Sequence, residues 1–404
     1  MKTSGSYSFI VKRSLLPVRK IYQNNFILVI LFVLLFTAGC KQEYKPPAID
    51  QDLGLLVIDG FLNNSPDTTI LRLTRTAKLQ NGLSNTGELN ATITINDANG
   101  NPLYFFQQLD DKGNYFLPGM NLGAGIKYSL AINTANGKLY QSDEIEPKAT
   151  PPIDSVSWER NNNGLQVFVN THDPARNTEY YRWEYTETWE YLSNFYSSLK
   201  YEDNTMLFRN FPADQVLQCW TTRQSTNLML ASSAKLSKDI IYRNPIQQIS
   251  LNSIELNVLY SINVRQYALS KDAFDYLINL KKLTEQRGTI FDAQPTELPG
   301  NIHCVSDPSE AVIGYVMAST MQSQRIFIRN RDVMPWRFNY ICDDHRVFSV
   351  DQDTLDFYFG TGYFYVPIEE VRIMGVLVGY DGGAAECVDC RRRGGTSIKP
   401  AFWP

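Results

Sequence analysis

Short stretches of alternating apolar and polar residues, separated by turn signals, recur along most of this chain and constrain its fold. The clearest covers residues 254–265, where apolar side chains fall on the even positions from Ile254 to Val264 and mainly polar ones fall between them. A period of two is expected of a strand with one buried face. Asn, Asp and Gly at 96–101 and 136–137 mark turns, because these residues tolerate positive φ. We therefore expect a mostly β protein.

The strand pattern divides into two parts at a proline-rich segment, residues 147–152. Before it, residues 53–147 hold short strands at regular spacing, which predicts an immunoglobulin-like or fibronectin-like antiparallel β-sandwich. After it, residues 153–404 predict a larger β-rich domain. Residues 190–250 are rich in Tyr, Asn, Ser and Gln without a clear period, and we interpret them as long loops.

One clear helix is expected in the second part. Ser270 is a suitable N-cap, and Phe274, Leu277 and Ile278 form an apolar stripe. Gly288 provides a C-terminal stop, because glycine readily adopts the left-handed conformation that ends many helices.

The N-terminus has the order of parts of a bacterial lipoprotein signal. Five basic residues and no acidic ones precede Cys40, and an apolar run covers residues 26–36. This run is shorter than the roughly 20 residues of a membrane-spanning helix, but it suits the apolar region of a cleaved signal. Ala38 and Gly39, both small, stand directly before the cysteine. We expect residues 1–39 to be removed as a signal peptide and Cys40 to carry a covalent lipid such as palmitate. The alternative is an uncleaved anchor with a coincidental cysteine.

Charge excludes one class of function. The leader holds five of the 38 basic residues and none of the 42 acidic ones, so residues 40–404 carry a net charge of −9. A nucleic-acid-binding protein needs a basic surface, and none is expected here. No other apolar run approaches membrane-spanning length. The lipid would therefore be the sole anchor, followed by a polar tether over residues 40–52.

Five cysteines beyond Cys40 are candidates for disulfides: Cys219, Cys304, Cys342, Cys387 and Cys390. An exported chain meets an oxidising environment, which favours bridges between them. Two bridges would leave one cysteine unpaired. We expect Cys342 to pair with either Cys387 or Cys390.

A zinc site is the alternative use of the same residues. Cys387 and Cys390 form a C-x-x-C, and Cys342 with His345 offers a second pair at matching spacing. Structural zinc takes four nitrogen or sulfur ligands, often as two such pairs. The alternative ligand set is His303, Cys342, His345, Cys387 and Cys390. In the disulfide interpretation we expect no metal and no cofactor apart from the lipid on Cys40.

The sequence contains no catalytic motif that we can identify. G-x-S-x-G, H-E-x-x-H and a glycine-rich phosphate loop are all missing. Aromatic residues instead crowd two segments, 183–196 and 358–365. Odd-numbered members of the first segment share one strand face, so we expect most of them in the core. The others are candidates for a surface that binds a partner or ligand.

Several short motifs resemble those of a known family. They occur in the order Val57-Ile58-Asp59-Gly60-Phe61-Leu62, Asp97-Ala98-Asn99-Gly100, Tyr128-Ser129-Leu130, Pro152-Ile153-Asp154-Ser155, Gly300-Asn301-Ile302, Gly314-Tyr315-Val316, Cys387-Val388-Asp389-Cys390, Gly394-Gly395-Thr396 and Lys399-Pro400-Ala401-Phe402-Trp403-Pro404. Together they resemble the Bacteroidota lipoproteins grouped as domain of unknown function 4249. The resemblance implies an outer-membrane lipoprotein, often encoded beside a TonB-dependent receptor. It implies no enzymatic activity and supplies no catalytic residues.

Three functions follow as hypotheses. The first is a lipid-anchored binding protein that helps a TonB-dependent receptor to capture or admit an unidentified ligand. The second is a metal-dependent or hydrolytic envelope enzyme using His303, Cys304, Cys342 and His345. The third is a structural lipoprotein of the cell envelope. The sequence leaves open whether the protein faces the cell surface or the periplasm.

Overall fold

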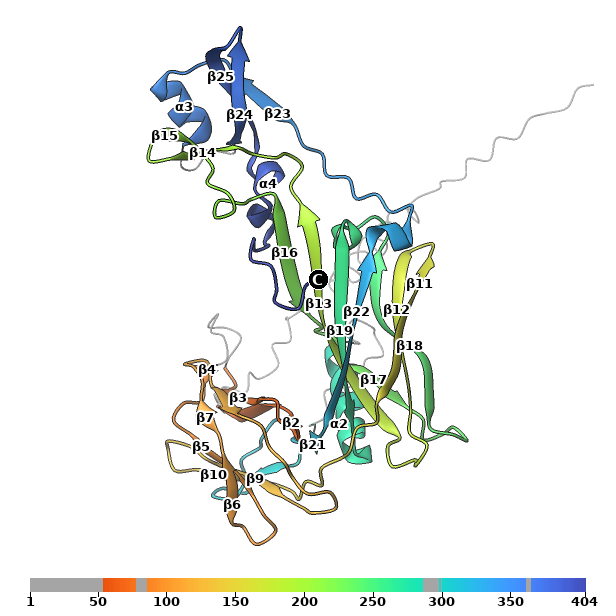
Figure 1. Cartoon of the computed structure of the whole chain (residues 1–404). Coiled ribbons are helices and arrows are strands. Elements are labelled where there is room, and N and C mark those ends of the chain that lie inside the picture. Colours follow the sequence, from red (N-terminus) through yellow and green to blue (C-terminus); the bar gives the residue numbers. More distant parts are fainter. Residues whose placement is uncertain (1–53, 78–85, 286–297, 299, 361–364) are drawn as a thin grey trace, which may run out of the picture. The chain divides into compact units, whose positions relative to one another are not determined.

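The first part of the chain folds into a β-sandwich (Figure 1). The computed structural model describes residues 54–77, 86–285, 298, 300–360 and 365–404. One sheet consists of β1 (Leu56–Gly60), β3 (Thr69–Arg75), β8 (Asn114–Leu117), β7 (Gln107–Gln108) and β4 (Thr86–Gly87). The other consists of β20 (Ile302–Cys304), β10 (Leu139–Ser142), β9 (Ser129–Asn133), β5 (Thr92–Asn96) and β6 (Pro102–Phe105). Apolar side chains of both sheets form one buried core.

Local sequence accounts for the strands and turns of this sandwich. Ile93 and Ile95 of β5 are fully buried, as the alternation in this segment predicts. The next turn is held by Asp97, whose carboxylate accepts hydrogen bonds from the backbone amides of Asn99 (2.9 Å) and Asn101 (2.8 Å). The prediction of a mostly β fold with antiparallel sheets is confirmed.

A later segment, residues 300–319, contributes strands to this first sandwich. Its strand β20 pairs with β10, and its strand β21 (Ala318–Ser319) lies parallel to β2 (Leu62–Asn63). The Asn301 side chain fixes the segment, because it donates to the carbonyl of Val316 and accepts from the Val316 amide, each at 2.8 Å. The sequence-based division assigned all of residues 153–404 to the second domain. That prediction is wrong for residues 300–319, because their strands pair with strands of the first domain.

The second part contains another pair of sheets around a shared core. One sheet has the order β11 (Ile153–Asn161), β12 (Gly164–His172) and β18 (Ile240–Ser250). The other has the order β16 (Gln218–Gln224), β13 (Tyr180–Leu192), β19 (Leu259–Ala268) and β22 (Met321–Arg329), with β17 (Met229–Ser232) also paired to β13. These strands correct the interpretation of 190–250 as long loops, because that region contains β14 to β18.

The central strand β13 places its odd-numbered side chains in the core. Tyr181, Trp183 and Tyr191 are each 1% exposed or less, so the expectation that most of the first aromatic cluster is core is confirmed. Glu187 lies on the same face with no exposed side-chain surface. Its carboxylate accepts hydrogen bonds from Arg223 (2.6 Å) and from the hydroxyl of Tyr260 (2.7 Å), which offset the cost of burying a charge.

The strand predicted over 254–265 begins later than expected. Residues Ile254–Leu256 form the short helix η2, and β19 starts at Leu259. From there the predicted face is correct, because Tyr260, Ile262 and Val264 are fully buried. A single turn of 3-10 helix can bury Leu256 as well as a strand would, and the alternating pattern does not distinguish the two.

Helix α2 (Lys271–Glu285) lies where the sequence predicted a helix. The hydroxyl of Ser270 accepts a hydrogen bond from the amide of Ala273 at 3.2 Å, which confirms the predicted N-cap. Ala273 and Leu277 are buried, with Phe274 packed beside them. The predicted stop at Gly288 lies outside the described residues. Within the described part of the chain, no helix is long and apolar enough to cross a membrane.

A third, smaller group of elements contains the sheet β23 (Asp344–Val347), β25 (Val376–Ala384) and β24 (Tyr365–Ile373). The hairpin β14 (Leu199–Glu202) and β15 (Thr205–Phe208) and helix α3 (Gln352–Phe359) pack with this sheet (Figure 1). Short helices η3 (Asn330–Val333), α4 (Ala385–Val388) and η4 (Cys390–Arg393) complete the described elements. Helix α3 was not anticipated, since its aromatic residues were interpreted as a cluster without assigned structure.

Candidate functional site

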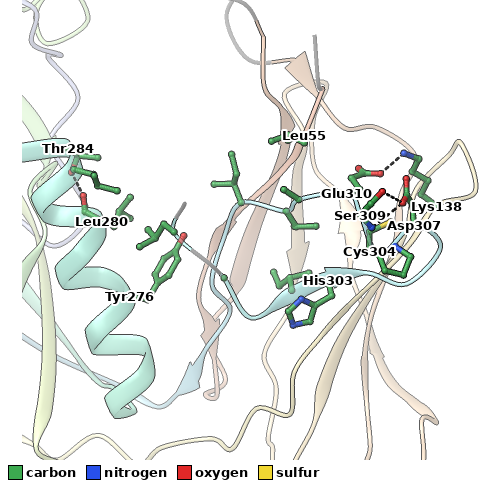
Figure 2. Close-up of a pocket in the computed structure, with 18 residues that line it drawn as sticks. Leu55, Lys138, Tyr276, Leu280, Thr284, His303, Cys304, Asp307, Ser309 and Glu310 are labelled. Atoms are coloured by element: carbon green, nitrogen blue, oxygen red, sulfur yellow. Dashed lines mark hydrogen bonds and ion pairs between the residues drawn. The ribbon is translucent and has the colours of Figure 1, made fainter. Parts of the chain in front are cut away.

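A pocket of about 1220 Å³ opens between helix α2 and the segment that completes the first sandwich. Figure 2 shows α2 on one side and a group of polar side chains on the other. The residues that line it come from four segments: Leu55, Lys138, Tyr276, Leu280, Leu283, Thr284, Leu298, Gly300, Ile302, His303, Cys304, Asp307, Pro308, Ser309, Glu310, Ala311, Val312 and Ile313. Such a volume is large enough for a small-molecule ligand, since ligand pockets commonly measure about 300–1,000 Å³.

Helix α2 supplies the apolar wall. Ala273, Tyr276 and Leu277 are buried in one core cluster with Leu280 packed against it, and Tyr276 and Leu280 also line the pocket. Residues three or four positions apart share one face of a helix, so Tyr276, Leu280 and Thr284 form a row along the opening (Figure 2). Tyr276 is 8% exposed, so the apolar surface that the helix offers to a ligand comes mainly from the partly exposed Leu280 and Leu283.

The polar side of the pocket is organised around Glu310. Its side chain is 9% exposed and bonds to the ammonium of Lys138. It also accepts a hydrogen bond of 2.6 Å from the hydroxyl of Tyr140 and lies 3.4 Å from the guanidinium of Arg75. Arg75 donates in turn to Glu88 at 2.6 Å. Every charge in this cluster has an opposite charge beside it.

These contacts favour the ionised form of Glu310, the ionised form of Lys138 and the neutral form of Tyr140. Burial by itself would raise the pKa of Glu310, but the hydrogen bonds from Lys138 and Tyr140 lower it below its ordinary value. The Glu310 carboxylate raises the pKa of Lys138. Burial, followed by the hydrogen bond to Glu310, raises the pKa of Tyr140. The cluster is therefore fixed as carboxylate, ammonium and neutral phenol at neutral pH, and no member is poised to exchange a proton there.

His303 and Cys304 lie at the pocket but differ in environment. The Nε2 atom of His303 is 3.0 Å from Asp143, and both side chains are more than 60% exposed. Cys304 is buried and its thiol is free, so it is not one of the disulfide cysteines. The strand register explains this, because Cys304 lies opposite Tyr140 in the first sandwich, far along the chain from the C-x-x-C.

The other four cysteines form two disulfides, Cys342–Cys387 and Cys219–Cys390. The first is one of the two pairings expected for Cys342. The C-x-x-C thus sends its two cysteines to different partners, separated from them by 45 and 171 residues. Helix α4 and η4, which carry the motif, are covalently tied both to the edge strand β16 and to the segment before β23.

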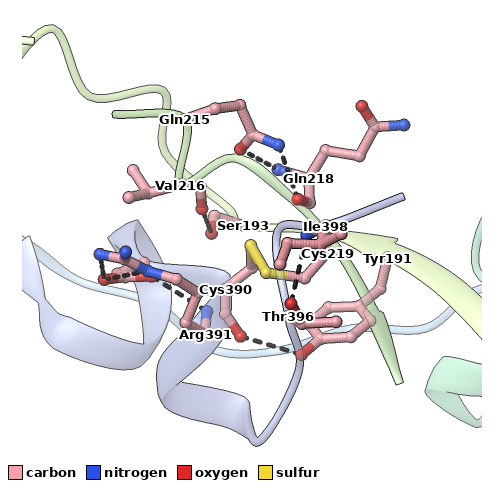
Figure 3. Close-up of a disulfide and its surroundings, with 11 residues drawn as sticks. Tyr191, Ser193, Gln215, Val216, Gln218, Cys219, Cys390, Arg391, Thr396 and Ile398 are labelled. Carbon is pink, nitrogen blue, oxygen red and sulfur yellow. Dashed lines mark hydrogen bonds and ion pairs between the residues drawn. A yellow bond between two sulfur atoms is a disulfide. The ribbon is translucent and has the colours of Figure 1, made fainter. Parts of the chain in front are cut away.

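The Cys219–Cys390 bridge also fixes the C-terminal segment (Figure 3). Tyr191 donates from its hydroxyl to the carbonyl of Cys390 at 2.9 Å. Beyond it, Thr396 pairs with Trp220 through two backbone hydrogen bonds of 2.9 Å. Finally, the indole of Trp403 donates to the carboxylate of Glu190 at 2.9 Å. The last residues of the chain are therefore packed on β13 and β16.

These bridges show that the alternative prediction of a zinc site is wrong for its three cysteines. Cys342, Cys387 and Cys390 are oxidised in the disulfides and offer no thiolate to a metal. His345 stacks between Tyr358 and Tyr365, with ring centroids at 5.2 and 5.1 Å. Among the described residues, no group of three or more His, Cys, Asp or Glu side chains is arranged to hold a metal ion.

Sequence reasoning located some of these residues and missed others. It singled out His303 and the disulfide cysteines but not the cluster of Arg75, Lys138, Tyr140 and Glu310. Glu310 is 172 residues from Lys138, and no local pattern connects the two. Cys40, the expected lipid attachment site, lies outside the described residues, so its role stays a prediction.

The chain belongs to the family described as a domain of unknown function (DUF4249), whose model matches residues 41–325. That match covers the pocket segments but ends before the C-terminal motifs that contributed to the resemblance. No curated protein matches the sequence. Among solved structures, a biofilm-associated protein BSP domain aligns with 54% of this chain and 28% of its own, at 13% identity and a TM-score of 0.19. A similarity of that size carries no argument about fold or function.

Proposed function

We propose that this chain is a lipid-anchored binding protein of the outer membrane in Bacteroidota. In this proposal, it captures a small ligand in the pocket beside α2 and acts with a TonB-dependent receptor that admits the ligand.

The observation that carries the proposal is the character of the pocket. Its helical wall is mainly apolar. On the opposite side Lys138 and Glu310 are already paired with each other, and the carboxylate of Asp307 accepts a hydrogen bond from Ser309.

His303 and Cys304 also line the pocket. They are neighbours in β20 and lie on opposite faces of it, His303 exposed beside Asp143 and Cys304 buried, so they do not form the hydrogen-bonded pair of base and nucleophile that covalent catalysis needs. A site with an apolar wall and a few fixed polar groups is instead typical of ligand binding.

The sequence supports the anchor and the partner. The basic leader, the short apolar run and the small residues before Cys40 are the parts of a lipoprotein signal. Family resemblance is the basis for the receptor partner. A lipid anchor would confine both proteins to one membrane plane, which raises their effective concentration for each other.

The pocket is tested by filling it. Ala311→Trp places a large side chain on the pocket wall, whereas Ala98→Trp adds the same side chain on the exposed turn after β5. Titration with anilinonaphthalene sulfonate, an anionic dye whose aromatic rings bind apolar surface, should give weaker binding for Ala311→Trp and unchanged binding for Ala98→Trp. Equal binding by the two variants would mean that the pocket is not the apolar binding site.

The anchor and the partner are tested together in cells. Cys40→Ser should remove the protein from the outer-membrane fraction, while Cys304→Ser, which alters a free buried thiol, should leave it there. Affinity purification of the tagged wild-type chain in mild detergent should recover a TonB-dependent receptor. Wild-type fractionation of Cys40→Ser would exclude the lipid anchor, and purification without any such receptor would remove the partner from the proposal.

A further inference from the structure

The hairpin between β24 and β25 ends in an exposed apolar tip. Met374 is fully exposed, and Ile373 and Val376 on either side are 54% and 65% exposed. Phe348 and Val350, which follow β23 beside β25, are 66% and 55% exposed. We call these five residues the hairpin tip. Exposed hairpin ends are usually polar, because apolar ones promote aggregation.

The backbone conformation of the tip is one that methionine adopts less favourably than asparagine does. Met374 and Gly375 are the two turn residues, and both have positive φ, 50° and 84°. Positive φ at both positions defines a tight hairpin turn in which Asn or Asp is strongly preferred before Gly. Methionine tolerates this conformation less well than Asn. The sequence therefore carries an apolar side chain at the position of greatest exposure despite a conformational cost.

The turn is also held rigid by its own side chains. Arg372 donates to the carbonyl of Gly375 at 3.0 Å and to the carboxylate of Glu370 at 2.8 Å. The arginine charge is thus neutralised next to the turn. From Ile373 to Gly379 the chain contains no charged residue, so the tip is a preorganised and uncharged apolar projection.

We propose that the hairpin tip inserts into the interfacial region of a lipid bilayer. A protein interface of standard size has a polar rim around its apolar centre, whereas residues 373–379 at the tip contain no charged side chain. A convex tip needs no complementary pocket to lose contact with water in a bilayer. Because the tip is uncharged, insertion depends on apolar burial and not on anionic lipids. This contact goes beyond the proposed function and does not require it.

The test reports directly on residue 374. The full chain is purified with Met374→Cys and labelled with an environment-sensitive nitrobenzoxadiazole probe. The two disulfides and the buried position of Cys304 leave the new thiol as the accessible one among the described residues. A matched protein carries the probe at Tyr242→Cys, an exposed aromatic position on β18. Both are mixed with vesicles of phosphatidylethanolamine and phosphatidylglycerol that contain a nitroxide on the lipid chains.

The expected result is a blue-shifted emission and several-fold stronger nitroxide quenching at 374 than at 242. Raising salt from about 0.1 M to about 1 M shortens the Debye length from about 10 Å to about 3 Å and should leave the quenching at 374 unchanged. Equal quenching at both positions, or quenching that salt abolishes, would overturn the proposal. A blue shift that appears only when a second protein is added, without nitroxide quenching, would mean that the tip binds a protein partner. That result would overturn the proposal as well.

A second variant separates membrane contact from folding. Met374→Asn should keep or improve the turn, because Asn tolerates positive φ, while removing the most exposed apolar side chain. With the probe at Val376→Cys, the added Met374→Asn change should reduce nitroxide quenching several-fold. The midpoint temperature of thermal unfolding should stay the same or rise. Undiminished quenching in this variant would contradict a role for Met374 in insertion. Loss of the Cys40 lipid would instead change the membrane fractionation of the whole chain. Failure of the lipid anchor can therefore be distinguished from failure of tip insertion.

Discussion

At the scale of single residues, the unexpected features are buried charges. Glu187 lies within the aromatic core of the second sandwich, and Glu310 lies in the wall of the pocket. Each is satisfied by a cation and a tyrosine hydroxyl from distant parts of the chain. A buried carboxylate is tolerated when such partners are present. Alternation placed Glu187 on the core face of β13, but it did not disclose what would pair with it.

The Glu310 cluster makes stability depend on pH in the acidic range. The pKa of Glu310 is lowered in the folded protein, so its stabilising effect is present above its ordinary pKa and is lost as pH falls through the lowered value. Glu310→Gln should reduce the free energy of unfolding by about 1–3 kcal/mol at neutral pH and flatten its decline in acid. Urea unfolding of both proteins at several acidic pH values measures this. Glu144→Gln, in an exposed pair with Lys127, should change stability by less than about 1 kcal/mol; a similar loss in both variants would contradict the argument.

At the scale of elements, local patterns located helix α2 and part of the strands, but they missed α3 and the strands within 190–250. The cap at Ser270 and the core face from Tyr260 to Val264 were readable from sequence. The start of β19 was not, because η2 buries Leu256 as a strand would. Three of the strands within 190–250, β14, β15 and β17, were hidden because they hold only four residues each. A period of two cannot be recognised reliably in so short a stretch. The longer β18 contains Pro245, and irregularities in its pairing with β12 interrupt the alternation.

The C-terminal segment behaves as an element although it forms neither helix nor strand near its end. Trp403 is buried against Trp220 and Leu259 and donates to Glu190. Trp403→Ala should destabilise the protein by about 3–5 kcal/mol, measured by denaturant unfolding. Trp403→Phe should cost about 1–3 kcal/mol, since packing is kept while one carboxylate oxygen loses its donor. Ile398→Ala, at an exposed position, should have little effect; a large loss there would indicate that any change in this segment unfolds it.

At the scale of the whole molecule, the two disulfides connect segments that are distant in sequence. Loop-closure entropy predicts a larger contribution from the bridge that closes the longer loop. For loops of 171 and 45 residues, the chain-entropy model gives about 5 and about 4 kcal/mol. Replacing Cys219 and Cys390 together by Ala should therefore lower the midpoint of thermal unfolding more than replacing Cys342 and Cys387. The reverse order would show that local packing, and not chain entropy, dominates.

The sequence by itself determined the mostly β class, the core faces of β5, β13 and β19, and the helix cap. Each of these depends on residues close together in the chain, where side-chain period and backbone preference act directly. Tertiary structure alone decided that β20 joins β10, that Cys219 pairs with Cys390, and that Glu310 meets Lys138. It also decided that a pocket forms beside α2. A period of two states which face of a strand is buried but not which strand lies next to it, and contacts between distant segments depend on that choice.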